Sequence, residues 1–130
     1  MGIRSYPDLV AWQLGVELSL RIYRCTSSLP GDERFGLVSQ LRRAAVSVPS
    51  NIAEGYGRGS TSDYVRFLKV ARGSLFELQT QVLITNRLGF LAGEAFEQLE
   101  EKSNELGRVL AGLIKSLESG AKEQPARPTA

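Results

Sequence analysis

Hydrophobic residues recur at intervals of three and four along most of the chain, which is the spacing of an α-helix. The first such segment runs from about residue 8 to residue 27, and Asp8 is placed to cap its start. It carries two adjacent apolar stripes: Leu9, Trp12, Val16, Leu20, Tyr23 and Leu14, Leu18, Ile22. A helix with two apolar stripes must be covered on more than one side.

A second helical segment follows the break at residues 30–31, and either Gly31 or Asp32 is able to start it. Its stripe consists of Val38, Leu41, Ala45, Val48 and Ile52. Gly55 is expected to end this helix, because glycine adopts the left-handed conformation freely.

Pro49 interrupts this second segment. Proline has no N–H, and its ring crowds the carbonyl of the residue four positions earlier, Ala45, so the spacing predicts a helix that is kinked at Pro49. The alternative is a break, which would leave barely more than one turn of helix after the proline. Ser47, Ser50 or a water molecule is expected to satisfy the freed carbonyl.

Two further helices complete the pattern. The third begins with a capping box, Ser60 to Asp63, and runs to about Leu88, where Gly89 closes it. Its stripe is Tyr64, Phe67, Ala71, Leu75, Leu78 and Val82. The fourth begins near Gly93, and its stripe is Phe96, Leu99, Ser103, Leu106, Leu110, Leu113 and Leu117.

Four long helices joined by short loops predict an all-α fold, an antiparallel up-down-up-down four-helix bundle formed by residues 1–118. The remaining residues, 119–130, contain two prolines and no apolar anchor. We expect them to form a disordered C-terminal tail.

Composition narrows the possible chemistry. The chain has 130 residues, a formal net charge of +2 and no histidine, which removes the commonest general base and metal ligand. Cys25 is the single cysteine, so an internal disulfide is excluded and a reducing, cytoplasmic location is favoured. No apolar run is long enough to span a membrane. We expect no metal site, no cofactor and no enzymatic activity.

Basic residues cluster around the glycine-rich stretch "EGYGRGS" and the start of the third helix. The cluster consists of Arg58, Arg66, Lys69 and Arg72, and Tyr56 and Tyr64 lie among them. Such a cluster attracts phosphates, and tyrosines stack on unpaired bases, which predicts an RNA or DNA site. An ordinary charged exterior is the alternative. The glycines do not form a P-loop, because no Lys-Ser/Thr pair follows them.

Polar residues form two rows at helical spacing. The second segment carries Gln40, Arg43, Ser47, Asn51 and Glu54, and the third carries Ser74, Glu77 and Gln81. The two rows are either separate solvated faces or surfaces that meet, inside the bundle or at a subunit boundary. If they meet, Arg43 is expected to pair with Glu77 or Glu54, because a buried charge requires a partner.

The same residues carry a resemblance to a known family. The stretches "DLVAW" (8–12), "QLRRAAVSVPSNIAEGYGR" (40–58) and "FLKVARGSLFELQTQV" (67–82) resemble the four-helix-bundle proteins first noticed as reading frames within intervening sequences of bacterial 23S rRNA genes. The resemblance covers roughly residues 6–117. A more remote likeness links this family to bundle proteins that serve as accessory factors of diversity-generating retroelements.

This resemblance implies an up-down-up-down bundle that assembles into a ring-shaped homopentamer. It places Arg43, Ser47, Asn51, Glu54, Ser74 and Glu77 on motif positions. It also suits the two stripes of the first helix, one facing the core and the other a neighbouring subunit, with Trp12 as an anchor. The resulting hypothesis is a non-enzymatic oligomer with a nucleic-acid-binding role. The alternative is a scaffold that docks a partner polypeptide without nucleic acid.

Overall fold

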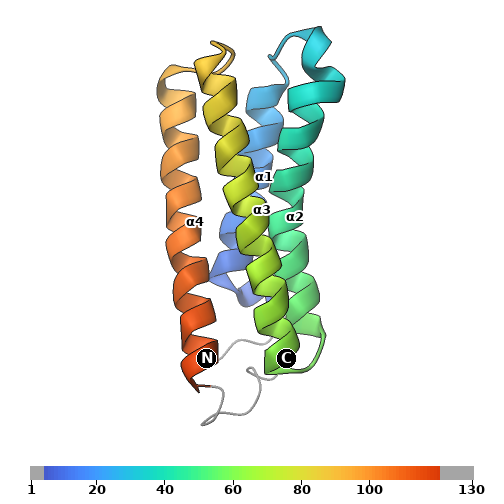
Figure 1. Ribbon diagram of the computed structural model, residues 1–130, viewed down its shortest axis with the longest axis vertical. Helices are drawn as coiled ribbons and strands as arrows, with labels where there is room; N and C mark the ends of the chain where they lie inside the picture. Colours follow the sequence, from blue (N-terminus) through green and yellow to red (C-terminus); the bar gives the residue numbers. More distant parts are fainter. Residues whose placement is uncertain (1–4, 121–130) are drawn as a thin grey trace.

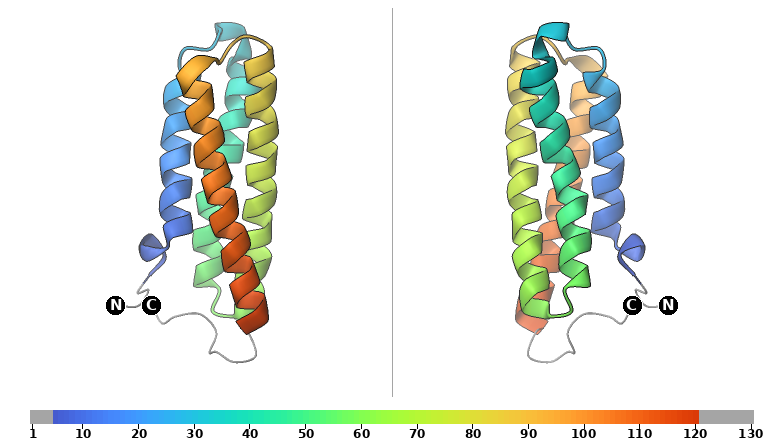
Figure 2. Two further views of the ribbon diagram at one scale, coloured as in Figure 1. Left: turned by 90° about the vertical axis from the view of Figure 1, so that its left-hand side faces the viewer. Right: turned by 90° about the vertical axis from the view of Figure 1, so that its right-hand side faces the viewer.

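The computed structural model describes residues 5–120 and contains four α-helices packed side by side (Figures 1 and 2). They are α1 (Val10–Thr26), α2 (Ser39–Gly57), α3 (Thr61–Arg87) and α4 (Gly93–Gly120). Residues 5–120 contain no strand, and the predicted all-α four-helix bundle is confirmed. The predicted tail overlaps the end of α4 by two residues, and its remainder lies outside the described residues.

Short irregular helices accompany the four long ones. The segment η1 (Tyr6–Asp8) precedes α1, and η2 (Gly31–Glu33) and η3 (Arg34–Val38) connect α1 to α2. The second helix therefore begins at Ser39, later than the sequence indicated. At the start of α1 the cap position is Leu9, which makes no side-chain hydrogen bond, and not Asp8 as the sequence predicted.

Contacts between neighbouring helices run in opposite residue order, which makes each neighbouring pair antiparallel. Between α1 and α2, Thr26 contacts Arg42 and Ser19 contacts Ala45. The other neighbouring helices show the same reversed order. The contacts are Gln40–Gln81 and Ser47–Ser74 between α2 and α3, Lys69–Glu118 and Gln79–Asn104 between α3 and α4, and Glu17–Lys102 and Arg21–Gln98 between α1 and α4.

The predicted stripes supply most of the core, and residues outside them, such as Leu68 and Ile114, add to it. Among its fully buried side chains are Leu18, Ile22, Leu41, Ile52, Leu68, Leu75, Leu78, Leu106 and Leu110. The α1 stripe that contains Trp12 lies differently: Leu9 is buried and Trp12 and Val16 are half-buried, whereas Leu20 and Tyr23 are exposed. Burial of this stripe therefore decreases along the helix, and its last two residues lie outside the core.

Pro49 lies within a continuous α2, which excludes a break; the kink itself stays a prediction. The freed carbonyl of Ala45 accepts a hydrogen bond of 3.0 Å from the hydroxyl of Ser19 on α1. The donor comes from the neighbouring helix and not from Ser47 or Ser50, so the prediction of either serine as the partner is wrong. Gly15 completes the arrangement, because a Cβ there would lie 3.2 Å from the proline ring.

Gly55 does not end α2, which corrects the sequence prediction. The helix continues through Gly57, and the residue with left-handed φ is Gly59, at +94°. Gly55 is instead a packing position, because a Cβ on it would lie 2.5 Å from the Cβ of Phe67 on α3. The other predicted signals hold: Ser60 accepts a hydrogen bond from the N–H of Asp63, and Gly89 has a φ of +86° just after α3.

Candidate nucleic-acid interface

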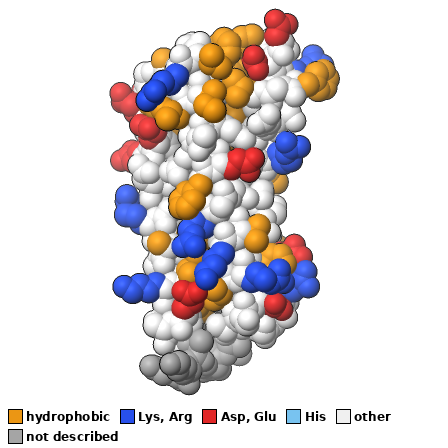
Figure 3. Space-filling model, in the orientation of Figure 1, with side chains coloured by type: hydrophobic (Ala, Val, Ile, Leu, Met, Phe, Trp, Pro, Cys, Tyr) orange, Lys and Arg blue, Asp and Glu red, His pale blue; other side chains and the backbone are white. Residues whose placement is uncertain are grey.

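The end of α2 and the first half of α3 bring the predicted basic cluster together at one end of the bundle. Figure 3 shows Lys and Arg side chains gathered in the lower half of the face that α3 crosses. The guanidinium groups of Arg58 and Arg66 lie 5.0 Å and 4.5 Å from the centre of the Phe67 ring. Phe67 thus positions two of the four cations beside each other.

Most of these charges already have a carboxylate partner. Arg58 pairs with Glu54 at 2.7 Å, Arg66 with Asp63 at 3.4 Å and Lys69 with Glu118 at 2.8 Å. Arg72, the fourth member of the cluster, is half-buried. All three ion pairs are roughly half exposed, and such pairs contribute only about 0.2–1 kcal/mol each. A phosphate is therefore able to compete with these carboxylates.

The stacking role expected for the two tyrosines is wrong. Tyr56 is 3% exposed and Tyr64 is 1% exposed, and their rings pack edge to face with centres 5.7 Å apart. Neither ring presents a free face to a base. Tyr56 therefore belongs to the core at this end of the bundle.

The polar rows of α2 and α3 do meet. The hydroxyls of Ser47 and Ser74 are 2.8 Å apart, and the amide of Asn51 donates to the Ser47 hydroxyl at 3.0 Å. Further along the same seam, the Gln81 amide donates to Gln40 at 3.3 Å and to Glu77 at 3.4 Å. The rows form a half-buried seam between the two helices.

The charged members of these rows stay on the outside. Arg43, Glu54 and Glu77 are exposed, and Glu54 pairs with Arg58. Within residues 5–120, Arg43 contacts neither Glu54 nor Glu77, so the expected pairing does not form inside the chain. A role for Arg43 at a subunit boundary remains a prediction.

Trp12, the predicted anchor of a subunit contact, is half-buried in the chain itself. Its ring packs edge to face against Tyr6, with the ring centres 5.3 Å apart, and it also contacts the core. Its place at a subunit boundary stays a prediction.

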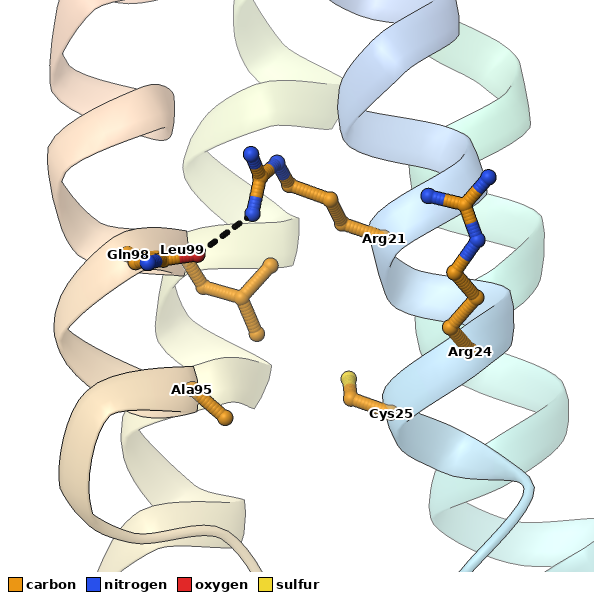
Figure 4. Close-up of a pocket in the computed structure, with 6 residues that line it drawn as sticks. All are labelled: Arg21, Arg24, Cys25, Ala95, Gln98 and Leu99. Atoms are coloured by element: carbon orange, nitrogen blue, oxygen red, sulfur yellow. Dashed lines mark hydrogen bonds between the residues drawn. The ribbon is translucent and has the colours of Figure 1, made fainter.

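A pocket between α1 and α4 is the candidate for a reactive or metal-binding site, as an alternative to nucleic-acid binding (Figure 4). Arg21 reaches across it and donates to the Gln98 side chain at 2.6 Å, and Cys25 borders it from α1. Burial raises the pKa of the Cys25 thiol, which keeps it protonated and weakly nucleophilic at neutral pH. Over the described residues, no group of three or more acidic or cysteine side chains is arranged to hold a metal ion.

Comparison with known proteins decides the family. The model of the 23S rRNA-intervening sequence protein family matches residues 7–112. The chain belongs to this family. No curated protein sequence matches it. A solved structure from Bacteroides thetaiotaomicron, of a protein with unknown function from the S23 ribosomal protein family, is 23% identical, with a TM-score of 0.75 over 82% of this chain and 96% of that chain.

The structural likeness supports the bundle fold of this 23S rRNA-intervening sequence protein. The family match extends from within η1 into the second half of α4, so it includes every predicted site residue. No helix among residues 5–120 combines the length and hydropathy that crossing a bilayer requires.

Sequence reasoning missed one surface of this family member, a groove between α1 and α2. The groove is lined by Tyr23, Ser39, Arg42, Arg43, Val46 and Ser47. Its two helices contribute residues from opposite sides of the α1–α2 connection, so no continuous motif marks it. The adjacent arginines at positions 42 and 43 are its only local signal.

Proposed function

We propose that this protein is a non-enzymatic, cytoplasmic homo-oligomer, a pentamer, that binds nucleic acid through basic side chains on its surface. The observation that carries the proposal is the pair of guanidinium groups held over Phe67, followed along α3 by Lys69 and Arg72. Guanidinium groups form bidentate contacts with phosphate oxygens. A ring of copies would repeat this cluster and multiply individually weak contacts.

The outer face of α3 supports self-assembly. Four large apolar side chains of this helix remain exposed in the single chain, Val70, Phe76, Leu83 and Ile84, and so does Leu88, the residue that caps its C-terminal end. Exposed apolar area of this kind is typical of surfaces that bind another protein. A pentamer is the assembly implied by the resemblance to the family, and a closed ring repeats one contact without leaving free ends.

These exposed apolar side chains also favour the second candidate function, a scaffold that docks a partner polypeptide without nucleic acid. The two candidates differ in what is lost on nuclease treatment. Partners of a scaffold remain bound after nuclease digestion, whereas partners held through nucleic acid are released.

Nucleic-acid binding is tested by fluorescence anisotropy with labelled RNA and DNA oligonucleotides at several salt concentrations. We expect binding that weakens as salt rises, because phosphate contacts release counterions. Absence of binding even at low salt would remove the proposal.

The oligomeric state is tested by light scattering coupled to size-exclusion chromatography. A pentamer gives a mass five times that of the 14.2 kDa chain. A particle with the mass of one chain would contradict the assembly and the multivalency argument with it.

A further inference from the structure

The groove between α1 and α2 differs from the predicted basic cluster in how its cations are held. Figure 2 shows the two helices side by side in its right-hand view. The groove contains Arg42 and Arg43 from α2 and the exposed ring of Tyr23 from α1. It lies toward the α1–α2 connection, at the end of the bundle opposite the Arg58–Arg72 cluster.

Arg42 is fixed in place by three contacts with α1. Its Nε donates to the Thr26 hydroxyl at 2.9 Å, and an Nη donates to the backbone carbonyl of Tyr23 at 3.3 Å. Its guanidinium carbon lies 4.4 Å from the centre of the Tyr23 ring. The result is a flat, positively charged platform made by a guanidinium group stacked on an aromatic ring.

The charges in the groove have no carboxylate partner in the described part of the chain. Neither Arg42 nor Arg43 takes part in an ion pair there, whereas Arg58, Arg66 and Lys69 each do. An incoming anion therefore displaces no carboxylate from this groove. Arg43 is also exposed, so its guanidinium group is free to contact a ligand.

A second hollow continues the same surface. It lies at the α1–α2 connection and shares Arg42 with the groove, and its polar lining includes Thr26, Ser27 and Arg34. Arg34 is exposed and likewise has no ion-pair partner among residues 5–120. The arginines at 34, 42 and 43 thus line one path across two adjoining hollows.

We propose that this path binds the backbone of a single-stranded nucleic acid, with a base stacked against the Tyr23–Arg42 pair. The inference rests on the proposed function and moves the main contact from the Arg58–Arg72 cluster to the α1–α2 groove. Arginines in a row supply contacts to successive phosphates, and the exposed Ser39 hydroxyl adds a hydrogen bond.

The choice of a single strand follows from the shape of the surface. The path lies between two antiparallel helices that pack side by side, and neither helix protrudes to enter a groove of a duplex. Aromatic and guanidinium planes bind bases whose faces are unstacked, and only unpaired strands expose such faces. The exposed Val46 beside the platform adds an apolar contact for a base or a sugar.

The test compares Arg43→Gln with Arg66→Gln, which removes one charge from the predicted cluster. Tyr23→Leu is a second groove variant that keeps apolar bulk but removes the ring. Affinity is measured by anisotropy with single-stranded RNA, single-stranded DNA and duplex RNA of equal length, each at several salt concentrations. Thermal melting and light scattering of every variant report its fold and its oligomeric state.

We expect Arg43→Gln to weaken single-strand binding roughly fivefold and to reduce the salt slope by about 1, because one phosphate contact is lost. Tyr23→Leu is expected to weaken binding with little change in the salt slope, since stacking is not an ionic contact. Arg66→Gln is expected to have a smaller effect than Arg43→Gln. The RNA and DNA arms show whether the 2′-hydroxyl contributes.

Three outcomes would overturn the inference while leaving the proposed function intact. The first is a loss of affinity in Arg66→Gln but not in Arg43→Gln or Tyr23→Leu. The second is equal affinity of the wild type for duplex and single strand. The third is a drop in oligomeric mass for Arg43→Gln with unchanged affinity, which would identify the groove as a contact between copies. Absence of binding by the wild type would defeat the proposed function itself.

Discussion

At the scale of single residues, the molecule depends on a few contacts between atoms that are far apart in sequence. The Ser19 hydroxyl lies 26 positions from the Ala45 carbonyl that it satisfies. The same hydroxyl also lies 2.9 Å from the carbonyl of Gly15. A small polar residue on α1 therefore stabilises a proline on α2.

Replacing Ser19 with Ala should destabilise the fold by about 1–3 kcal/mol, because the buried Ala45 carbonyl would lose its donor. Chemical denaturation monitored by circular dichroism measures the free energy of unfolding. Ser50→Ala is the matched control on α2, where the side chain is exposed, and it should change stability by less than about 0.5 kcal/mol. A larger effect at Ser50 than at Ser19 would contradict this assignment.

At the scale of helices, the close crossing of α2 and α3 depends on a residue without a side chain. Gly55 faces Phe67, and the Cβ position on Gly55 is within 3.3 Å of the Tyr64 carbonyl as well. The two aromatic residues that pack at this crossing, Tyr56 and Tyr64, fill the end of the core beside it.

Gly55→Ala should lower the free energy of unfolding by about 1–3 kcal/mol, since α2 and α3 would have to move apart. Gly112→Ala is the control within α4, because a Cβ there meets nothing within 4 Å. That change should raise stability by about 0.5–1 kcal/mol through the better helix propensity of alanine. Thermal melting of both variants gives the comparison, and equal melting temperatures would argue against a tight crossing.

The sequence predicts the helices well because apolar spacing is a local property of each segment. It does not predict that Gly59 follows the end of α2 while Gly55 allows the close crossing with α3. What distinguishes Gly55 is its contact with Phe67, which lies on another helix. The burial of the two tyrosines could be predicted from the sequence. Tyr64 belongs to the apolar stripe of α3, and Tyr56 extends the α2 stripe four residues beyond Ile52. The groove with Tyr23 and Arg42 could not be predicted from the sequence, because its residues meet only after α1 and α2 have packed.

At the scale of the whole molecule, the α1–α2 groove and the exposed apolar side chains of α3 belong to different helices. The exposed apolar side chains of α3 include Phe76, which is 54% exposed, and Leu83, which is 39% exposed. The lining of the α1–α2 groove includes no α3 residue. Self-assembly through α3 and nucleic-acid binding in the groove therefore use different residues, whereas Arg66, Lys69 and Arg72 share α3 with the exposed apolar side chains.

Phe76→Lys and Leu83→Lys should each reduce the oligomeric mass, because a charge placed in an apolar contact loses its hydration without a partner. Val10→Lys is the control, since Val10 is 57% exposed on α1. Light scattering of the three variants at equal concentration provides the measurement. A wild-type mass for both α3 variants would show that assembly does not use these side chains.

Pro49 on α2 packs closely against Gly15 on α1. A Cβ at position 15 would lie 3.2 Å from the proline ring, so a side chain there would have to displace α1 or α2 slightly. Arg42 is held against α1 by its bonds to Thr26 and Tyr23, so it already lies beside the Tyr23 ring before a ligand arrives. Little conformational freedom remains to be lost on binding, which leaves more of the contact energy available for affinity.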